Sequence, residues 1–337
     1  MGYDPVIYCD LPRNPLGEAW KAFRIHPLTK TSHYHGFRRA FFPFLLGLTK
    51  HIWSSPGNIW LVLDCPPLFW VALLGRLRRK QVIYDSHELF LETPLVMGRR
   101  SRRMFWRLWH DGGIALIRKM IAVSPLCAEY LREHYPGKQV YLLPNAPRIL
   151  PISDRPKPGM ENGTNLIFQG GLRVATGLEE TMRAMTLQPH YRLEIFGFGP
   201  EEPALKRLME KMGLPGRVRF HGAIPFTELP SHMEAAHIGL HLMQPICLSF
   251  ALTLANKLFD YVHTLTPVLL SDNPAHRDFL AKHPVGVAVD SFSPTSVSDG
   301  LEKIAANLEG YRRACAHARE EWHWDHFISG LQGFLES

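Results

Sequence analysis

The sequence has few cysteines and no long apolar run. Its five cysteines are far apart and never form a Cys-x-x-Cys pair, which indicates reduced thiols in a cytosol-like compartment. The longest apolar stretches, residues 41–46 around a proline and residues 68–74, are far shorter than the roughly 20 residues that span a bilayer. The first residues are acidic and proline-containing, unlike a secretion signal. We therefore expect a cytoplasmic protein.

Signs of a metal centre are also scarce. Nearby histidines occur at His33 and His35 and at His323 and His326, but no His-Glu-x-x-His motif or cysteine cluster accompanies them. No two aspartates are separated by a single residue, an arrangement that can hold a divalent ion on a diphosphate. We expect neither a metal nor a resident cofactor, and we interpret these histidines as ordinary surface or core residues.

The length and the charge distribution indicate two unlike halves. A chain of 337 residues with 46% hydrophobic residues can form two domains with cores of their own. Residues 1–150 contain 21 Lys and Arg against 10 Asp and Glu, whereas residues 151–337 contain 17 against 21. The positive half favours an anionic partner such as a phospholipid leaflet, a lipid diphosphate or a polyanion, unless it is only a solvated face.

Short apolar segments alternate with helix-length segments through most of the chain. In the first half we expect strands at 59–63, 81–84, 120–123 and 140–143 and helices at 68–79, 101–119 and 124–135. In the second half we expect strands at 165–168, 192–196, 218–220, 238–242 and 268–270 and helices at 178–185, 202–212, 227–236, 254–262, 274–280, 296–307 and 308–319. This alternation predicts an α/β fold with two parallel, Rossmann-like sheets.

Five prolines between residues 144 and 158 mark a linker between the two sheets. We place a basic, acceptor-side domain at 1–147, the linker at 148–162 and a donor-side domain at 163–315. A final helix at 316–337 is expected to fold back on the first domain. Two such domains bring the carboxyl ends of their strands to a shared cleft, where ligands bind.

The most specific segment reads Asn-Lys-Leu-Phe-Asp-Tyr-Val at residues 256–262, followed by Pro-Val at 267–268. It resembles a signature of glycosyltransferase family 4, whose members have the GT-B fold. The resemblance implies that Asp260 holds the ribose hydroxyls of a sugar nucleotide, and that Asn256 and Lys257 belong to the same donor site, with Lys257 reaching the diphosphate. From the residues alone, Lys257 and Asp260 could equally form a surface ion pair on an amphipathic helix.

Further segments match the same family in order along the chain. They are residues 82–90, 122–124, 143–147, 168–178 and 195–200. The Tyr-Asp-Ser-His-Glu run at 84–88 resembles one branch of the family and implies that His87 faces the cleft beside the transferred sugar.

Four glycines in the second half, at turns after two expected strands, allow backbone N–H groups to approach a phosphate closely. They are Gly170, Gly171, Gly197 and Gly199. We add Arg173, just beyond the first turn, as a second cation for the diphosphate. Tight turns without a ligand, and a merely exposed arginine, are the plainer interpretations.

The chain also departs from the family pattern. Two cations that the family often carries are replaced by Gly171 and Thr176, and the upstream glutamate of its Glu-x-seven-Glu pattern falls at Leu252. The glycine that usually precedes the Pro-Val pair falls at Leu265. Only residues 6–9 indicate the strand with which the family opens, so we expect the first unit to be shortened or remodelled.

Two segments, 37–46 and 99–109, mix arginines with large apolar side chains. Membrane-surface helices have this composition, as do single-stranded nucleic-acid platforms, but so do core helices with basic outer faces. Nucleic-acid binding ranks last, because no recognised nucleic-acid-binding module accompanies the basic residues.

Taken with the resemblance, these features favour a cytoplasmic sugar transferase that uses a nucleotide-sugar and a glycan or lipid-linked acceptor, which is presented on or near the inner face of a membrane. The resemblance implies a retaining reaction, and the lack of paired aspartates favours one without a metal. We expect His87, Arg173 and Lys257 to act at the reacting groups. The departures keep two other interpretations open: a GT-B scaffold that supports a partner transferase, and a sugar-nucleotide epimerase.

Overall fold

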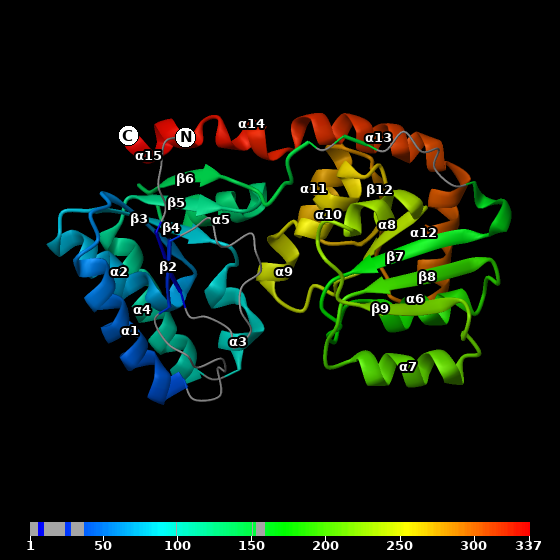
Figure 1. The fold of residues 1–337 in the computed structure, drawn as a ribbon, viewed down its shortest axis with the longest axis horizontal. Coiled ribbons are helices and arrows are strands. Elements are labelled where there is room, and N and C mark those ends of the chain that lie inside the picture. The colour runs from blue at the N-terminus through cyan, green and yellow to red at the C-terminus, as the bar shows by residue number, and fades with distance from the viewer. Residues whose placement is uncertain (1–5, 10–23, 28–36, 99, 150, 153–158) are drawn as a thin grey trace.

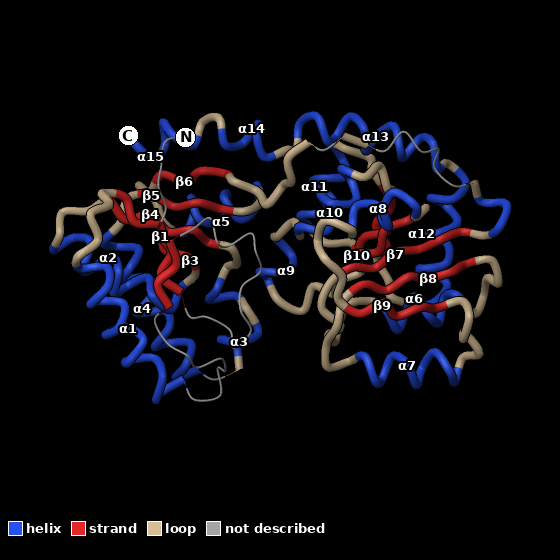
Figure 2. The backbone as a smooth tube through the Cα atoms, in the orientation of Figure 1, coloured by secondary structure: helices blue, strands red, loops and turns tan. Residues whose placement is uncertain are grey.

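The computed structural model describes residues 6–9, 24–27, 37–98, 100–149, 151–152 and 159–337. These residues form two α/β halves, each built on a parallel sheet, and a helical segment that runs from the second half back to the first (Figure 1). Figure 2 shows the two sheets as separate red layers with helices beside them. His33 and His35 lie outside the described residues.

The first half contains a four-stranded sheet. Its strands are β3 (Ile59–Leu63), β4 (Gln81–Ser86), β5 (Lys119–Ala122) and β6 (Gln139–Leu142). They follow one another in space in the order of the sequence, and every pair is parallel. All carboxyl ends therefore lie at one edge of the sheet. The expected strand at 6–9 is present as β1 (Val6–Cys9), which pairs in parallel with β2 (Arg24–Pro27) in a separate two-stranded sheet.

Helices of the first half bury one face of the four-stranded sheet. They are α1 (Phe37–Trp53), α2 (Cys65–Leu77), α4 (Arg100–Leu116) and α5 (Pro125–His134), with the short η2 (Phe90–Glu92) and α3 (Pro94–Met97) between them. Helix α1 buries Phe41, Leu45, Leu48 and Ile52, which recur at helical spacing. These apolar side chains therefore form part of the core of the first half.

The second half contains a six-stranded parallel sheet in the order β12-β11-β10-β7-β8-β9. Its strands are β7 (Thr164–Gln169), β8 (Tyr191–Phe196), β9 (Val218–Gly222), β10 (Ile238–His241), β11 (Val268–Ser271) and β12 (Gly286–Val289). Its helices are α6 (Leu178–Met185), α7 (Glu202–Lys211), α8 (Leu229–Ala235), α9 (Leu248–Leu252), α10 (Asn256–His263), α11 (Pro274–Lys282), α12 (Pro294–Ala306) and α13 (Leu308–Glu321). Two apolar clusters, one on each face, make this sheet the best-covered layer of the described chain.

Some expected boundaries need correction. Helix α10 begins at Asn256, two residues later than expected, because Ala255 is still extended with ψ of 148°. The sequence interpretation missed β12 and α9. It also expected one helix at 316–337, where α13 ends at Glu321 and two short helices follow, α14 (Trp324–Ile328) and α15 (Leu331–Glu336).

Helices α14 and α15 lie against the open face of the first sheet (Figure 1). Leu331 packs there on Ile83 of β4 and Ile121 of β5. The ammonium of Lys119, which is 5% exposed, donates to the carbonyls of Phe334 at 2.6 Å and Leu335 at 3.4 Å. A lysine at the end of a helix satisfies carbonyl groups that lack partners within the helix.

Among the described residues, none of the helices combines the length and apolarity of a membrane span. The cysteines at 65, 127, 247 and 315 are all buried and free.

Candidate active site

Three turns lie side by side at the carboxyl edge of the second sheet. The N–H of Gly170, after β7, donates to Phe196 O at 2.9 Å, and the N–H of Gly197, after β8, donates to Gly222 O at 2.8 Å. Leu172 N also donates to Phe198 O at 3.1 Å. Because β7, β8 and β9 are parallel neighbours, their ends form one continuous backbone surface.

The glycines of this surface are required by close packing of the turns. A Cβ on Gly197, whose φ is +135°, would lie 1.9 Å from Gly170 O, and one on Gly199 would lie 2.1 Å from Leu172 O. Gly170 itself has φ of +130°, and a Cβ there would lie 3.0 Å from Lys257 Nζ. Gly171 is exposed and no main-chain atom crowds it. Turn packing thus accounts for Gly197 and Gly199 without a ligand, whereas the close approach at Gly170 is to a cation.

Helix α10 places Lys257 and Asp260 at this surface. Lys257 Nζ lies 4.4 Å from the centre of the Phe168 ring, and Asp260 accepts a hydrogen bond from Gln169 Nε2 at 2.7 Å. Both side chains are half-buried, and they influence each other by charge without forming a close ion pair, which differs from a surface ion pair. Asn256, the first residue of α10, is exposed.

Burial changes the acidity of both groups. It lowers the pKa of Lys257 to about 8, against the opposing charge of Asp260. It raises the pKa of Asp260 to about 6, against the hydrogen bond from Gln169 and the charge of Lys257. A half-buried ammonium without a carboxylate partner is a site for an anion.

His87 follows β4 at the carboxyl edge of the first sheet. Its Nε2 lies 3.3 Å from Asp85 Oδ2, and the hydrogen bond to Asp85 raises the pKa of His87, with the charges of Asp64 and Glu88 adding to the effect of Asp85. The imidazole is therefore held by carboxylates on the first half. It belongs to a different sheet from Lys257 and Asp260.

Three carboxylates around His87 were missed from the sequence. Asp64 directly follows β3, and it has φ of 60° and ψ of 170°, a backbone region that is essentially reserved for glycine. Burial raises the pKa of Asp64 and of Glu88. Asp64 and Asp85 lie at the carboxyl ends of neighbouring parallel strands, which is the signal that could have identified them.

The charge of Arg173, on the second half, acts on Glu88, on the first half. Arg173 is exposed beyond the Gly170 turn, and its charge opposes the rise in the pKa of Glu88 beside His87. The positions where the family often has cations differ here: Gly171 carries no side chain, and Thr176 Oγ1 donates to Arg173 O at 3.0 Å. Lys257 and Arg173 are the cations that the sequence interpretation placed at this edge.

Helix α9 connects the two edges through direct hydrogen bonds. Leu89 N donates to Ser249 Oγ at 3.1 Å, and Ser124 Oγ donates to Leu252 O at 2.6 Å. Leu252, where the family pattern has a glutamate, packs on the core of the first half. The apolar side chain of Leu252 therefore contributes to packing between the two halves.

No three His, Cys, Asp or Glu side chains gather as metal ligands within the ranges that the structure describes. The rings of His323 and His326 lie 6.0 Å apart at the start of α14.

Comparisons with known proteins agree with this architecture. Comparison with curated proteins found no match. Among solved structures, sucrose-phosphate synthase from Thermosynechococcus elongatus is similar with a TM-score of 0.76 and 16% identity, over 99% of this chain and 89% of that one. HepE from Anabaena in complex with UDP and glucose has a TM-score of 0.74 and 13% identity, over 95% and 88%. WaaG, a glycosyltransferase involved in lipopolysaccharide biosynthesis, has a TM-score of 0.68 and 16% identity, over 97% and 89%.

These likenesses show the fold: two Rossmann-like domains in the GT-B arrangement. The family model described as glycosyl transferases group 1 matches residues 153–321, which is half of the chain and contains the Gly170 turn and α10. The chain therefore belongs to the group 1 glycosyl transferases and is a glycosyltransferase.

Proposed function

We propose that this glycosyltransferase moves a sugar from a nucleotide-sugar to a glycan or lipid-linked acceptor in the assembly of cell-surface glycans or glycolipids. The observation that carries the proposal is Lys257, a half-buried ammonium that lies over the Gly170 turn without a carboxylate partner. A diphosphate supplies the negative charge that this position lacks. Structures of HepE have been obtained with UDP-glucose, which supports a donor of this class.

Each residue of the site has a role in the proposal. Lys257 and Arg173 neutralise the departing diphosphate, while Asp260 accepts hydrogen bonds from the ribose hydroxyls. His87 donates a hydrogen bond to the transferred sugar or to the acceptor hydroxyl, from the edge opposite the donor site. Asn256 and the backbone at Gly170 and Gly171 complete the donor site.

The charge of the leaving group can be met by the side chains present. Two cations, Lys257 and Arg173, lie at the same edge of the sheet, so the proposal needs no divalent ion on the diphosphate. We also propose retention of the anomeric configuration and membership of family 4, on the resemblance of residues 256–268 and 84–88.

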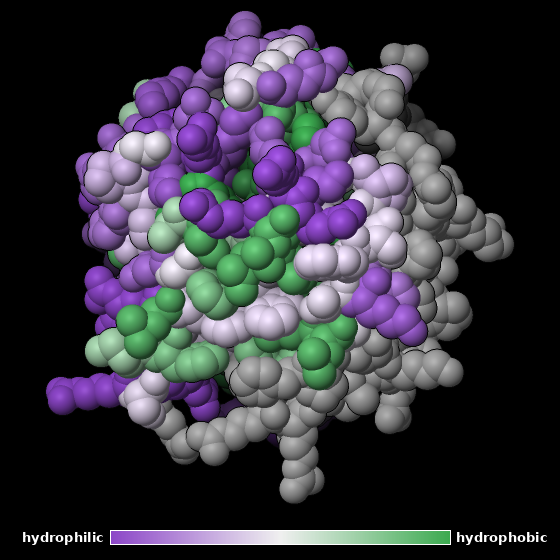
Figure 3. Space-filling view, turned by 90° about the vertical axis from the view of Figure 1, so that its left-hand side faces the viewer, coloured by the Kyte–Doolittle hydropathy of each residue, from purple (hydrophilic) through white to green (hydrophobic). Residues whose placement is uncertain are grey.

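A membrane surface is the proposed location of the acceptor. Figure 3 shows the outer face of the first half, where apolar side chains gather between hydrophilic ones. The exposed apolar residues of α3 and α4 are Leu95, Met97, Met104, Phe105 and Leu108, and the exposed arginines of α4 are Arg100, Arg102, Arg103 and Arg107. A helix that combines these two classes fits an anionic lipid surface at the cytoplasmic side.

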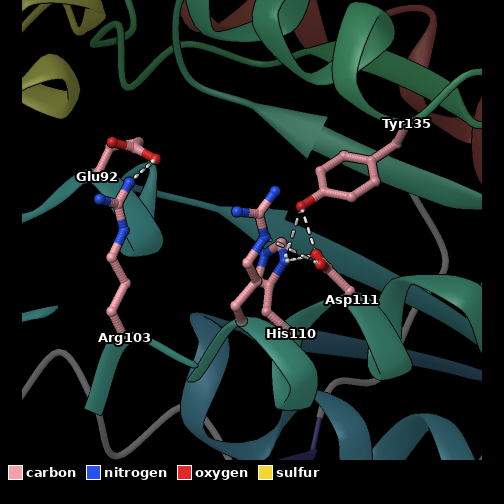
Figure 4. A network of polar contacts seen from close by, with 6 residues as sticks. Glu92, Arg103, His110, Asp111 and Tyr135 are labelled. Carbon is pink, nitrogen blue, oxygen red and sulfur yellow. Dashed lines mark hydrogen bonds and ion pairs between the residues drawn. The ribbon is translucent and has the colours of Figure 1, made fainter. Parts of the chain in front are cut away.

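The orientation of α4 is fixed by contacts with the rest of the first half (Figure 4). Tyr135 OH donates to Asp111 Oδ1 at 2.9 Å and lies 3.1 Å from His110 Nδ1, while Arg103 pairs with Glu92 at 3.2 Å. Together with the burial of Trp106 and Ile114 on the inner side of α4, these contacts leave Met104, Phe105 and Leu108 exposed.

A nucleotide-binding experiment tests the donor site. Thermal unfolding is measured with UDP, GDP, ADP, CMP and dTDP, because a ligand of the folded state stabilises by about 2.7 kcal/mol at 100 times its Kd. We expect one nucleotide to raise Tm clearly, and Lys257→Ala and Asp260→Ala to remove the shift.

The matched control is Lys206→Ala, which removes an exposed lysine of α7 that pairs with Glu202. It should leave the shift unchanged. A wild-type protein that responds to none of the five nucleotides contradicts the proposal.

Leu252 supports a second candidate function. Because it replaces a polar residue of the family pattern with a side chain that packs on the other half, the protein could be a scaffold with reduced catalysis. Co-purification with an active transferase, without sugar transfer or donor hydrolysis by the purified chain, would favour the scaffold.

A further inference from the structure

Helix α9 belongs to the donor-side half but contacts the segment that carries His87. Ser249 on α9 is 1% exposed, and its hydroxyl accepts the N–H of Leu89 at 3.1 Å. Leu89 lies two residues after His87, and its side chain is buried in the core of the first half. The hydrogen bond therefore joins the His87 segment to the other half of the molecule (Figure 1).

Ser249 is also rigidly connected to the donor site. Thr253 Oγ1 donates to Ser249 O at 2.7 Å, and Leu254 is buried in the core below α10. Only three residues separate the end of α9 from Asn256. The position of the Ser249 hydroxyl is thereby tied to that of Lys257.

The His87 segment has one other polar support, on its own half. Ser86 Oγ donates to Glu88 O at 2.9 Å, and Asp85 lies 3.3 Å from the imidazole. These contacts place His87 relative to the first sheet. The bond to Ser249 is the described hydrogen bond that places this segment relative to the donor half.

We propose that Ser249 is a positioning residue for sugar transfer, which holds Leu89 N–H and so sets the distance between His87 and the donor bound at Lys257. The inference rests on the proposed function, because it assigns His87 to the transferred sugar or the acceptor. Without the hydroxyl, the buried N–H of Leu89 loses its acceptor, and the His87 segment relaxes away from the donor half. Small displacements of reacting groups lower rates strongly while donor binding is retained.

The test uses Ser249→Ala and Ser249→Cys in the full chain. Both remove a good acceptor, and the slightly larger cysteine leaves no cavity, so a cavity alone cannot explain a shared effect. We expect both variants to lower kcat about 10- to 100-fold with the nucleotide Kd close to wild type and a modestly lowered Tm, because the Leu89 N–H loses its acceptor. A kcat within twofold of wild type in a folded variant overturns the inference.

Ser124→Ala is the matched control. It removes another hydrogen bond between α9 and the first half, the one to Leu252 O, and also the cap that Ser124 provides for Cys127 N in α5. Its Tm should fall further than that of Ser249→Ala because of the lost cap, but kcat should remain. A loss of kcat equal to that of Ser249→Ala would show that contact between the halves matters in general, and would overturn the specific role.

A double-mutant comparison shows whether Ser249 acts through His87. In a His87→Ala background, Ser249→Ala should cause no further loss of kcat. Equal fold losses in both backgrounds contradict the inference.

NMR titration of His87, assigned from the His87→Ala variant, requires no turnover. Because Asp85 lies on the first half together with His87, its effect on the pKa of the imidazole should persist in Ser249→Ala, whereas the ring resonances of His87 should shift as the segment moves relative to the donor half. Unchanged ring resonances overturn the inference even if the wild type proves not to transfer sugar, whereas a wild type without transfer overturns only the proposed function.

Discussion

Lys257 and Asp260 titrate on either side of neutral pH, and both are expected to touch the donor. A pKa of about 8 for Lys257 means that the ammonium loses its proton above that pH in the free protein, whereas a pKa of about 6 for Asp260 means that the carboxylate is neutralised below it. Diphosphate binding requires the charged lysine, and the ribose requires the charged aspartate. The donor affinity should therefore be highest between these two values.

The pH prediction is checked by calorimetric titration of an intact nucleotide-sugar from pH 5 to pH 9. Affinity should fall by up to about tenfold per pH unit above the pKa of Lys257, with proton uptake on binding. Lys257→Arg keeps its charge and should lose this alkaline decline, and Asp260→Asn should lose the acidic one. Lys206→Ala should retain both, and an affinity that is flat over the whole range contradicts the assignment.

Leu265 shows how the fold accommodates a residue that departs from the family pattern. Leu265, where the family usually has glycine, has φ of 53°. The turn between α10 and β11 thus keeps a left-handed backbone that glycine adopts without strain, although leucine costs roughly 1–2 kcal/mol there. The partly buried side chain of Leu265 packs on the core of the second half, which offsets this cost.

At the scale of elements, α4 is the one whose function can be tested alone. Met104→Glu combined with Leu108→Glu places two charges on its exposed apolar face, where the side chains are 59% and 69% exposed. Binding to vesicles that contain anionic lipid should fall about tenfold or more, because apolar burial and attraction to the anionic surface are both weakened.

The control for α4 is Leu187→Glu, a similarly exposed leucine in the second half. It should leave vesicle binding unchanged. Sedimentation with vesicles measures both variants, and wild-type binding should weaken with added salt. Equal losses in the two variants would show that α4 does not face the lipid.

Elements with a strong local signal could be predicted from the sequence. Residues 59–63 and 178–185 form β3 and α6 with the expected bounds, because apolar periodicity is continuous within them. Helix α9 has five residues and no side-chain cap, and β12 has only four residues at the sheet edge, so neither has a sufficient local pattern. Their positions are decided by tertiary contacts.

At the scale of the whole molecule, α15 stabilises the half that it does not belong to in sequence. Leu331→Ala removes a side chain that is 8% exposed and packs on Ile83 and Ile121. We expect the free energy of unfolding to fall by about 2–3 kcal/mol. Gln332→Ala, on the exposed side of α15, should change it by less than about 0.5 kcal/mol.

Urea denaturation measures these two variants. Similar stability of Leu331→Ala and Gln332→Ala would contradict the view that α15 seals the first sheet.

Only those features of the site that lie within a single domain could be predicted from the sequence. The spacing of Lys257 and Asp260 on one helix is local, and so is the place of His87 after a strand. By contrast, the bond from Leu89 to Ser249 joins residues 160 positions apart, and no pattern in the sequence indicates it. The strained backbone of Asp64 is likewise a product of the folded chain.

The packing of α15 on the first sheet also has a consequence for synthesis on the ribosome. Strands β4 and β5 emerge early, but the helix that covers Ile83 and Ile121 is made only after the whole second half. At about 5–20 residues per second, this apolar face stays uncovered for roughly 10–40 s of translation. During that interval the apolar face with Ile83 and Ile121 is exposed on the nascent chain. Chaperones can bind this face until α15 covers it.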